Sequence, residues 1–173
     1  MLYHIICHKW EISAYSLLTA EIITFISSLL SGDMGSYSGI MAIIALSGKG
    51  GVGKTTTVVN LAAALSARKR AVLVVDLDPQ AHATLGLGLE KQQGVSLYPV
   101  LLGEKPIEDV IQPTKWNNLN VIPSEVDLAG AELEFGARPD RLEMIRNALA
   151  PVKEAGAFDY IVLDCPPSLG VVM

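Results

Sequence analysis

The chain has 173 residues, of which 50% are hydrophobic, and a formal net charge of -5 at pH 7. This length is typical of about one domain, and the apolar content is sufficient for a substantial core. The acidic balance excludes a globally basic nucleic-acid binder, and the two cysteines, Cys7 and Cys165, form no CxxC pair or disulfide framework. We therefore expect a globular protein of the reducing cytosol.

The first 40 residues differ from the rest of the chain. Residues 12–30 are mostly apolar but contain Glu21 and several serines and threonines, which is unfavourable in a membrane-spanning helix and in a signal peptide. The stretch SGDMGSYSG, residues 31–39, is typical of a linker. We expect residues 1–40 to be an atypical, non-essential extension and residues 41–173 to form the domain. A membrane-binding or partner-binding helix in the extension is the alternative.

Strands and helices are predicted to alternate from Met41 onward. Four apolar runs are typical of buried strands: 41–48, 71–78, 118–124 and 158–167. Three longer helices are predicted between them: 54–69, 124–135 and 139–156. Glycines and prolines divide residues 79–117 into loops and short helices. This alternation predicts a three-layer α/β fold with a mostly parallel sheet.

A glycine-rich stretch joins the first of these strands to the first helix. The sequence GKGGVGKT, residues 48–55, fits the phosphate-loop pattern G-x-x-x-x-G-K-[ST]. Glycines allow successive backbone N–H groups to surround phosphate oxygens, and the helix N-terminus adds the positive end of its dipole. Lys54 is expected to contact the β- and γ-phosphates, and the Thr55 hydroxyl to bind Mg²⁺. The predicted nucleotide-binding residues are Gly48, Lys49, Gly50, Gly51, Val52, Gly53, Lys54, Thr55 and Thr56.

Carboxylates stand at the ends of two predicted strands, where ligands bind in open parallel sheets. Asp164 follows the apolar run YIVL and is predicted to hold the magnesium shell through a water. Asp76 and Asp78 alternate along one strand and so share a face. One is expected to orient waters on the metal and the other to polarise the attacking water, with structural hydrogen bonds as the alternative for this pair. The predicted metal-site residues are Thr55, Asp76 and Asp164.

Together these motifs resemble the ParA/Soj ATPases of chromosome and plasmid partitioning. That family lies in the deviant Walker A group of phosphate-loop NTPases, which includes MinD-type and nitrogenase iron-protein-like enzymes. The matching stretches are KGGVGKTT (49–56), DLDPQ (76–80), ATLGLG (83–88), NLNVIPSEVDLAGAELE (118–134) and DYIVLDCPPSLG (159–170). The resemblance runs from Met41 to the last residue.

The resemblance implies a cytoplasmic, nucleoid-associated enzyme that hydrolyses ATP with Mg²⁺ and forms an ATP-dependent sandwich homodimer. Lys49, Lys54 and Asp78 would be its catalytic residues. Lys49 would reach the nucleotide of the partner subunit, Gly50 would allow the two chains to approach closely, and Asp78 would position the hydrolytic water. Residues 166–168 would belong to a switch that senses the γ-phosphate. A ParB-like protein would stimulate hydrolysis, and DNA would be bound non-specifically.

The chain departs from the family pattern at both ends. Residues 1–40 are not part of the pattern, and family chains continue beyond the last residue of this one. The resemblance is therefore to a C-terminally truncated copy, whose missing part would supply the DNA-binding surface and most adenine contacts. The edge of the phosphate-loop strand would be left unpaired. Two alternatives remain open: a MinD-like membrane-cycling ATPase, although we expect no membrane partner, and a truncated, non-catalytic remnant.

Overall fold

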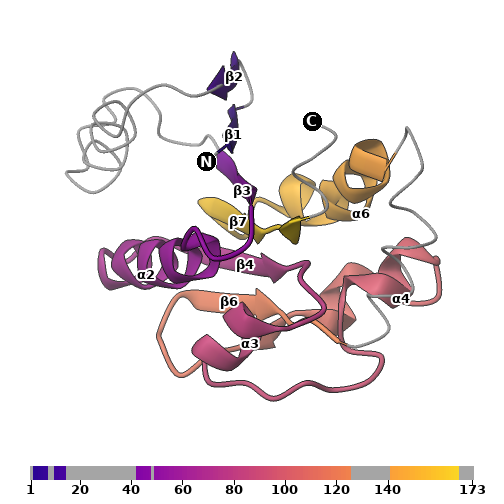
Figure 1. Ribbon diagram of the computed structural model, residues 1–173. Coiled ribbons are helices and arrows are strands. Elements are labelled where there is room, and N and C mark those ends of the chain that lie inside the picture. Colours follow the sequence, from indigo (N-terminus) through magenta and orange to yellow (C-terminus); the bar gives the residue numbers. More distant parts are fainter. Residues whose placement is uncertain (1, 8–9, 15–41, 48, 126–140, 168–173) are drawn as a thin grey trace.

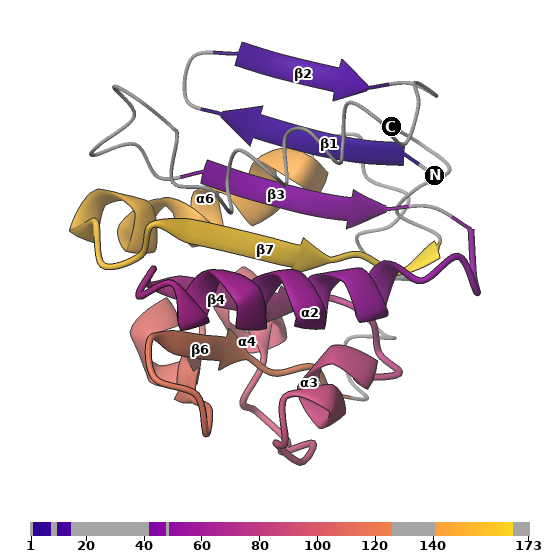
Figure 2. The same ribbon diagram turned by 90° about the vertical axis from the view of Figure 1, so that its left-hand side faces the viewer.

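The strands that the structure describes form a single mixed sheet. The computed structural model describes residues 2–7, 10–14, 42–47, 49–125 and 141–167. The strands of this part lie in the order β2-β1-β3-β7-β4-β6-β5 (Figures 1 and 2). Their bounds are β1 Leu2–Cys7, β2 Trp10–Ala14, β3 Ala42–Ser47, β4 Val72–Asp76, β5 Gln112–Pro113, β6 Leu119–Ile122 and β7 Tyr160–Asp164.

The centre of the sheet is parallel. β7 pairs in parallel with β3 on one side and with β4 on the other, and β4 pairs in parallel with β6. The last strand in sequence thus lies between two earlier ones, and the carboxyl ends of all four meet at one edge. The predicted α/β fold with a mostly parallel sheet is confirmed.

Helices cover both faces of this sheet. Their bounds are α2 Lys54–Ala67, α3 His82–Gly86, α4 Leu97–Leu101, the 3-10 helix η1 Ile107–Val110 and α6 Arg141–Ala155. Side chains of β4 alternate between two apolar clusters: Val72 and Val74 pack with α2 and α3, whereas Leu73 and Val75 pack with α4, η1 and α6. Because β4 is covered on both sides, it is apolar at every position before Asp76. The fold therefore has the three predicted layers.

The predicted helix after β6 lies mostly outside the described residues. Ser124 and Glu125 are described and buried, but residues 126–140 are not described. The other predicted long helices agree with α2 and α6 to within a few residues, and residues 79–117 form short helices as expected. No helix in the described part of the chain is long and apolar enough to cross a membrane.

The edge of the phosphate-loop strand β3 is paired, which corrects the expectation of an open edge. β1 runs antiparallel along the whole of β3, from Leu2 opposite Ser47 to Cys7 opposite Ala42. β2 then pairs antiparallel with β1. The physical reason is that a strand edge carries backbone N–H and C=O groups that gain hydrogen bonds from any neighbouring extended segment. The boundary at residue 41 stays a prediction, and residues 15–41 lie outside the described part.

Candidate functional site

The loop between β3 and α2 has the open, glycine-dependent shape that its sequence predicts. Gly51 and Gly53 have positive φ values of 76° and 88°, a region that side-chain-bearing residues rarely adopt. A Cβ atom at Gly50, Gly51 or Gly53 would meet no other atom within 4 Å. The loop thus borders free space rather than packed protein. Gly48 lies outside the described residues.

Helix α2 begins at this loop without a side-chain cap. Gly53 is its N-cap residue and makes no side-chain hydrogen bond, because it has no side chain to make one. The N–H groups of the first turn are therefore available to an anion, and the helix dipole favours negative charge at the same place. Thr55 is half-buried and Thr56 is exposed in this turn. The arrangement can bind a phosphate group.

The two lysines of the loop are in different environments. Lys54 is only 7% exposed, and its Nζ donates a hydrogen bond of 3.1 Å to the carbonyl oxygen of Lys49. The ammonium group is therefore held against the loop. Lys49 is itself exposed at the surface. The Lys54 ammonium is thus bound within the loop of its own chain, whereas the Lys49 side chain is exposed to solvent.

Two buried carboxylates stand next to each other at the carboxyl ends of β4 and β7. Asp76 pairs with Asp164 in the strand register, and both are almost completely buried. Asp76 Oδ2 accepts hydrogen bonds from the backbone N–H and the hydroxyl of Thr84, at 2.8 and 2.7 Å. Its Oδ1 accepts one from the N–H of Asp78 at 3.2 Å. Burial raises the pKa of Asp76, and the bonds from Thr84 oppose that increase.

The carboxylate of Asp164 has no such partners. Neither of its oxygens has a hydrogen-bond partner of normal geometry among the described residues. Burial raises its pKa to about 6; the nearby Thr55 side chain opposes the increase, the charges of Asp76 and Asp78 add to it, and Lys54 lowers it. A buried carboxylate without hydrogen bonds is typical of a position that a cation and its waters complete. The chemistry of Asp164 fits this role.

The donor set favours a hydrated hard cation. No group of three or more His, Cys, Asp and Glu side chains able to hold a metal occurs within the described ranges. The site instead offers the carboxylate of Asp164 and the hydroxyl of Thr55, with Asp76 beside them. Mg²⁺ is typically held by one or two protein oxygens, substrate phosphates and several waters. The residues present are therefore compatible with Mg²⁺ and do not form a cage for a fully dehydrated ion.

Asp78 lies in a tight turn directly after β4. Its Oδ1 accepts a 2.9 Å hydrogen bond from the N–H of Gln80, and its carbonyl accepts one of 2.8 Å from the N–H of Ala81. This is the turn-stabilising role that is typical of aspartate before proline. The side chain is half-buried and so remains partly accessible. The turn places Asp78 near Asp164, whose pKa it raises.

Two polar residues near this site were not assigned to it from the sequence. Thr84 and Ser124 are fully buried, and the Thr84 hydroxyl accepts a hydrogen bond from the Ser124 N–H at 2.9 Å. Ser124, the first residue of the helix predicted over 124–135, donates its hydroxyl to the Asp78 carbonyl at 2.6 Å. The sequence signal for them was a hydroxyl residue within the otherwise apolar stretches ATLGLG and VIPS.

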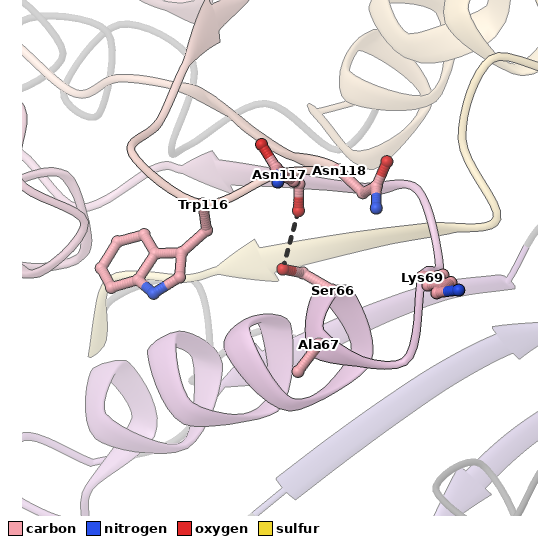
Figure 3. A pocket seen from close by; sticks show the side chains of 6 residues that line it. All are labelled: Ser66, Ala67, Lys69, Trp116, Asn117 and Asn118. Carbon is pink, nitrogen blue, oxygen red and sulfur yellow. Dashed lines mark hydrogen bonds between the residues drawn. The ribbon is translucent and has the colours of Figure 1, made fainter.

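A separate pocket of about 800 Å³ lies between the C-terminal end of α2 and the residues just before β6 (Figure 3). It is lined by Ser66, Ala67, Lys69, Trp116, Asn117 and Asn118. The Ser66 hydroxyl donates a 3.0 Å hydrogen bond across it to the carbonyl of Asn117. None of the predicted site residues lines it, because it lies at the C-terminus of α2 and the start of β6. Ligands of open α/β sheets bind at the carboxyl ends of the strands, where the loop and the aspartates are.

Comparisons with known proteins agree with this arrangement. A protein family described as an AAA domain matches residues 41–173. The chain is 47% identical over 126 residues to the chromosome partitioning protein ParA of Myxococcus xanthus, which is 72% of this chain and 44% of that protein. It is 47% identical over 125 residues to the sporulation initiation inhibitor protein Soj of Bacillus subtilis, which is 72% of this chain and 49% of that protein.

A solved structure shows the same fold. The structure of cobyrinic acid a,c-diamide synthase from Mycobacterium smegmatis, with a bound ATP analog and magnesium, matches with a TM-score of 0.65 and 41% identity. The match covers 74% of this chain and 50% of that one. This chain therefore spans about half the length of the proteins that it matches.

Proposed function

Because the chain belongs to the ParA/Soj family within the AAA domain class, as its motifs predicted, we propose that it is a magnesium-dependent ATPase of chromosome or plasmid partitioning. The observation that carries this proposal is the combination of an open glycine loop at a helix N-terminus with two buried carboxylates at adjacent strand ends. The first is suited to phosphates, and the second to a hydrated cation beside them. Asp164, whose buried carboxylate accepts no hydrogen bond from the part of the chain that the structure describes, lies near both Thr55 of the first turn of α2 and Asp76.

The roles of the loop residues follow from their positions. The backbone N–H groups of residues 49–56 surround the phosphates of ATP, and the Lys54 ammonium stabilises the charge of the β- and γ-phosphates. The Thr55 hydroxyl and the carboxylates of Asp76 and Asp164 would hold the metal and its waters. Mg²⁺, when bound, neutralises charge that develops on the phosphates. Asp78 accepts a hydrogen bond from the water that attacks the γ-phosphate.

The exposed lysine gives the proposal its second part, an ATP-dependent homodimer. The Lys49 side chain is exposed at the surface of the loop. Its carbonyl oxygen accepts a hydrogen bond from the ammonium group of Lys54. A cation at this place is available to the phosphates of a nucleotide bound by a second copy of the chain. Gly50 has no side chain that would keep the two copies apart. Hydrolysis would then require the dimer, and a ParB-like protein and non-specific DNA would regulate the same cycle in the cytoplasm, at the nucleoid.

A comparison of two lysine variants tests both parts. ATP binding is measured by calorimetry with and without Mg²⁺, dimers by sedimentation velocity, and turnover by phosphate release. We expect Lys54→Ala to lower ATP affinity at least about tenfold, which corresponds to about 1.4 kcal/mol. Lys49→Ala should retain binding but lose the ATP-dependent dimer. Lys153→Ala, at an exposed position of α6, is the matched control.

The outcomes separate the two parts. If the unmodified protein shows no Mg²⁺-dependent ATP binding, the ATPase proposal is wrong. If it binds ATP but Lys49→Ala still forms dimers, only the role of Lys49 is wrong.

A further inference from the structure

Two buried hydroxyl groups connect the carboxylates of the site to the rest of the fold. We propose that Thr84 and Ser124 are positioning residues: Thr84 orients the carboxylate of Asp76 toward the metal, and Ser124 holds the turn that carries Asp78. This inference rests on the proposed ATPase function and assigns a role to residues outside the phosphate loop and the strand-end aspartates. It follows from the direction of each hydrogen bond.

Thr84 holds one oxygen of the Asp76 carboxylate. Its Oδ2 accepts two hydrogen bonds from Thr84, one from the backbone at 2.8 Å and one from the hydroxyl at 2.7 Å. A carboxylate oxygen accepts about two hydrogen bonds, so Oδ2 is saturated. Oδ1 accepts one from the described residues, at 3.2 Å from the N–H of Asp78, and retains capacity for another. Oδ1 is therefore the atom with which Asp76 can contact a water of the metal shell.

Ser124 determines which way the hydroxyl proton of Thr84 points. The backbone N–H of Ser124 donates to Thr84 Oγ1 at 2.9 Å. Because that N–H can only donate, the hydroxyl acts as an acceptor on this side and its own proton points to Asp76. Ser124 thus fixes the donor role of Thr84. A hydroxyl held in this way supports a carboxylate with a defined orientation.

The backbone of Asp78 is held by two hydrogen bonds to its carbonyl oxygen. The Ser124 hydroxyl donates to the Asp78 carbonyl oxygen at 2.6 Å, and the same oxygen accepts the N–H of Ala81 at 2.8 Å. These two bonds fix the backbone at Asp78 from the end of β6 and from the turn itself. One residue, Ser124, therefore supports both aspartates, with its N–H through Thr84 and with its hydroxyl directly.

The support is itself anchored in the core. Glu125, which follows Ser124, is 3% exposed; its Oε2 accepts the N–H of Gly94 at 2.7 Å, and its Oε1 accepts the hydroxyl of Ser96. Each of these bonds ties the end of β6 to the segment before α4. A buried polar network in which the members are paired is rigid, because any rotation leaves a desolvated group without a partner. Residues that orient metal ligands in this way typically change metal affinity or activity when they are replaced.

Three substitutions test the role of Thr84. Thr84→Val keeps the shape of the side chain and removes the hydroxyl, whereas Thr84→Ser keeps the hydroxyl. Ser66→Ala is the control, since it removes another buried hydroxyl at the far end of α2, where the Ser66 side chain bonds to Asn117. The readouts are thermal unfolding, ATP affinity without metal, and the Mg²⁺ concentration that gives half-maximal ATP binding.

We expect Thr84→Val to raise the half-maximal Mg²⁺ concentration about tenfold, in the range found for outer-shell partners of metal ligands. ATP affinity without metal should stay within about twofold, because the phosphate loop is untouched. Thr84→Ser should restore the Mg²⁺ dependence to within about twofold of the unmodified protein, and Ser66→Ala should alter unfolding only.

Ser124→Ala provides a second, milder test if the valine variant does not fold. It leaves the backbone N–H that bonds to Thr84 and removes only the bond to Asp78. The turnover of ATP should fall, while the half-maximal Mg²⁺ concentration should not change.

The inference is overturned if Thr84→Val binds Mg²⁺ as the unmodified protein does, or if Ser124→Ala leaves turnover unchanged. An unmodified protein without Mg²⁺-dependent ATP binding would instead overturn the proposed ATPase function, and this inference with it.

Discussion

Asp76 and Asp164 lie opposite each other in the register of β4 and β7, yet their carboxylates have opposite hydrogen-bonding states. Asp76 accepts three hydrogen bonds, whereas Asp164 accepts none from the described residues. The first carboxylate is therefore held in one orientation by the protein. The second is left to interact with the cation that we propose for this site. The ionised Asp164 carboxylate should therefore destabilise the folded protein when no cation is bound.

Replacing Asp164 by asparagine should stabilise the protein in the absence of nucleotide and metal, in a pH-dependent way. Its pKa is about 6 in the folded state and near 3.8 when unfolded, so burial of the ionised form destabilises the fold fully above pH 6 and not below about pH 4. The gain in Asp164→Asn should be on the order of 3 kcal/mol at pH 8, since the pKa rises from 3.8 to about 6 and one pKa unit corresponds to about 1.4 kcal/mol. Chemical denaturation at several pH values measures it.

The stability gain of Asp164→Asn must depend on pH in one direction only. The gain must shrink as the pH falls from about 6 to about 4, because Asp164 is then protonated in the unmodified protein. Asp109→Asn, at an exposed position of η1, controls for the loss of one negative charge. A gain that does not depend on pH would show that the ionisation of Asp164 is not its cause.

Substituting alanine for Gly53 should destabilise the fold through the backbone alone. A Cβ there would meet no atom within 4 Å, but φ is 88°, where alanine is strained. Such strain costs about 1–3 kcal/mol per residue. Gly50→Ala is the matched control, since its Cβ would also enter open space and Gly50 is not among the residues with positive φ. Equal melting temperatures for the two variants would contradict the loop conformation described above.

Asparagine at position 78 should separate the structural role of Asp78 from its proposed catalytic role. Asp78→Asn retains an oxygen that can accept the N–H of Gln80, so the turn and the stability should be preserved. Hydrolysis of ATP should fall about 10²–10⁴-fold, the range for loss of a proton acceptor. Asp78→Ala should lose both hydrolysis and some stability. Single-turnover phosphate release and thermal unfolding give the two readouts, and unchanged hydrolysis in both variants would remove Asp78 from the mechanism.

A form of the protein that starts at Met41 tests the pairing of β1 with the edge of β3. In this form β3 loses its antiparallel neighbour β1, and its outer edge carries unpaired backbone groups. Exposed strand edges promote association, so the shortened protein should self-associate without nucleotide and unfold at a lower temperature. Light scattering and calorimetry measure both. A shortened protein that stays monomeric and equally stable would instead agree with the non-essential extension expected from the sequence.

The sequence by itself determined the elements whose signals are local. The sequence predicted a strand over 41–48, a glycine-rich loop after it and a helix over 54–69, and the structure has β3, the loop with Gly51 and Gly53 in positive φ, and α2 at these places. The same reasoning placed Asp76 and Asp164 at strand ends, because composition and periodicity report which residues along a segment are buried, and each aspartate ends an apolar run. These signals were sufficient for the fold class and for proposing a candidate site at the carboxyl ends of the strands.

Only the tertiary structure decided which of these elements are neighbours. The insertion of β7 between β3 and β4 brings Asp164 opposite Asp76, and the return of the chain after β6 brings Ser124 to Thr84. The pairing of β1 with β3 was not expected at all. Lateral strand order and buried side-chain hydrogen bonds depend on groups that are far apart in sequence, and no local period records them. The type of chemistry could therefore be inferred from the residues, while the orientation of each carboxylate required the folded chain.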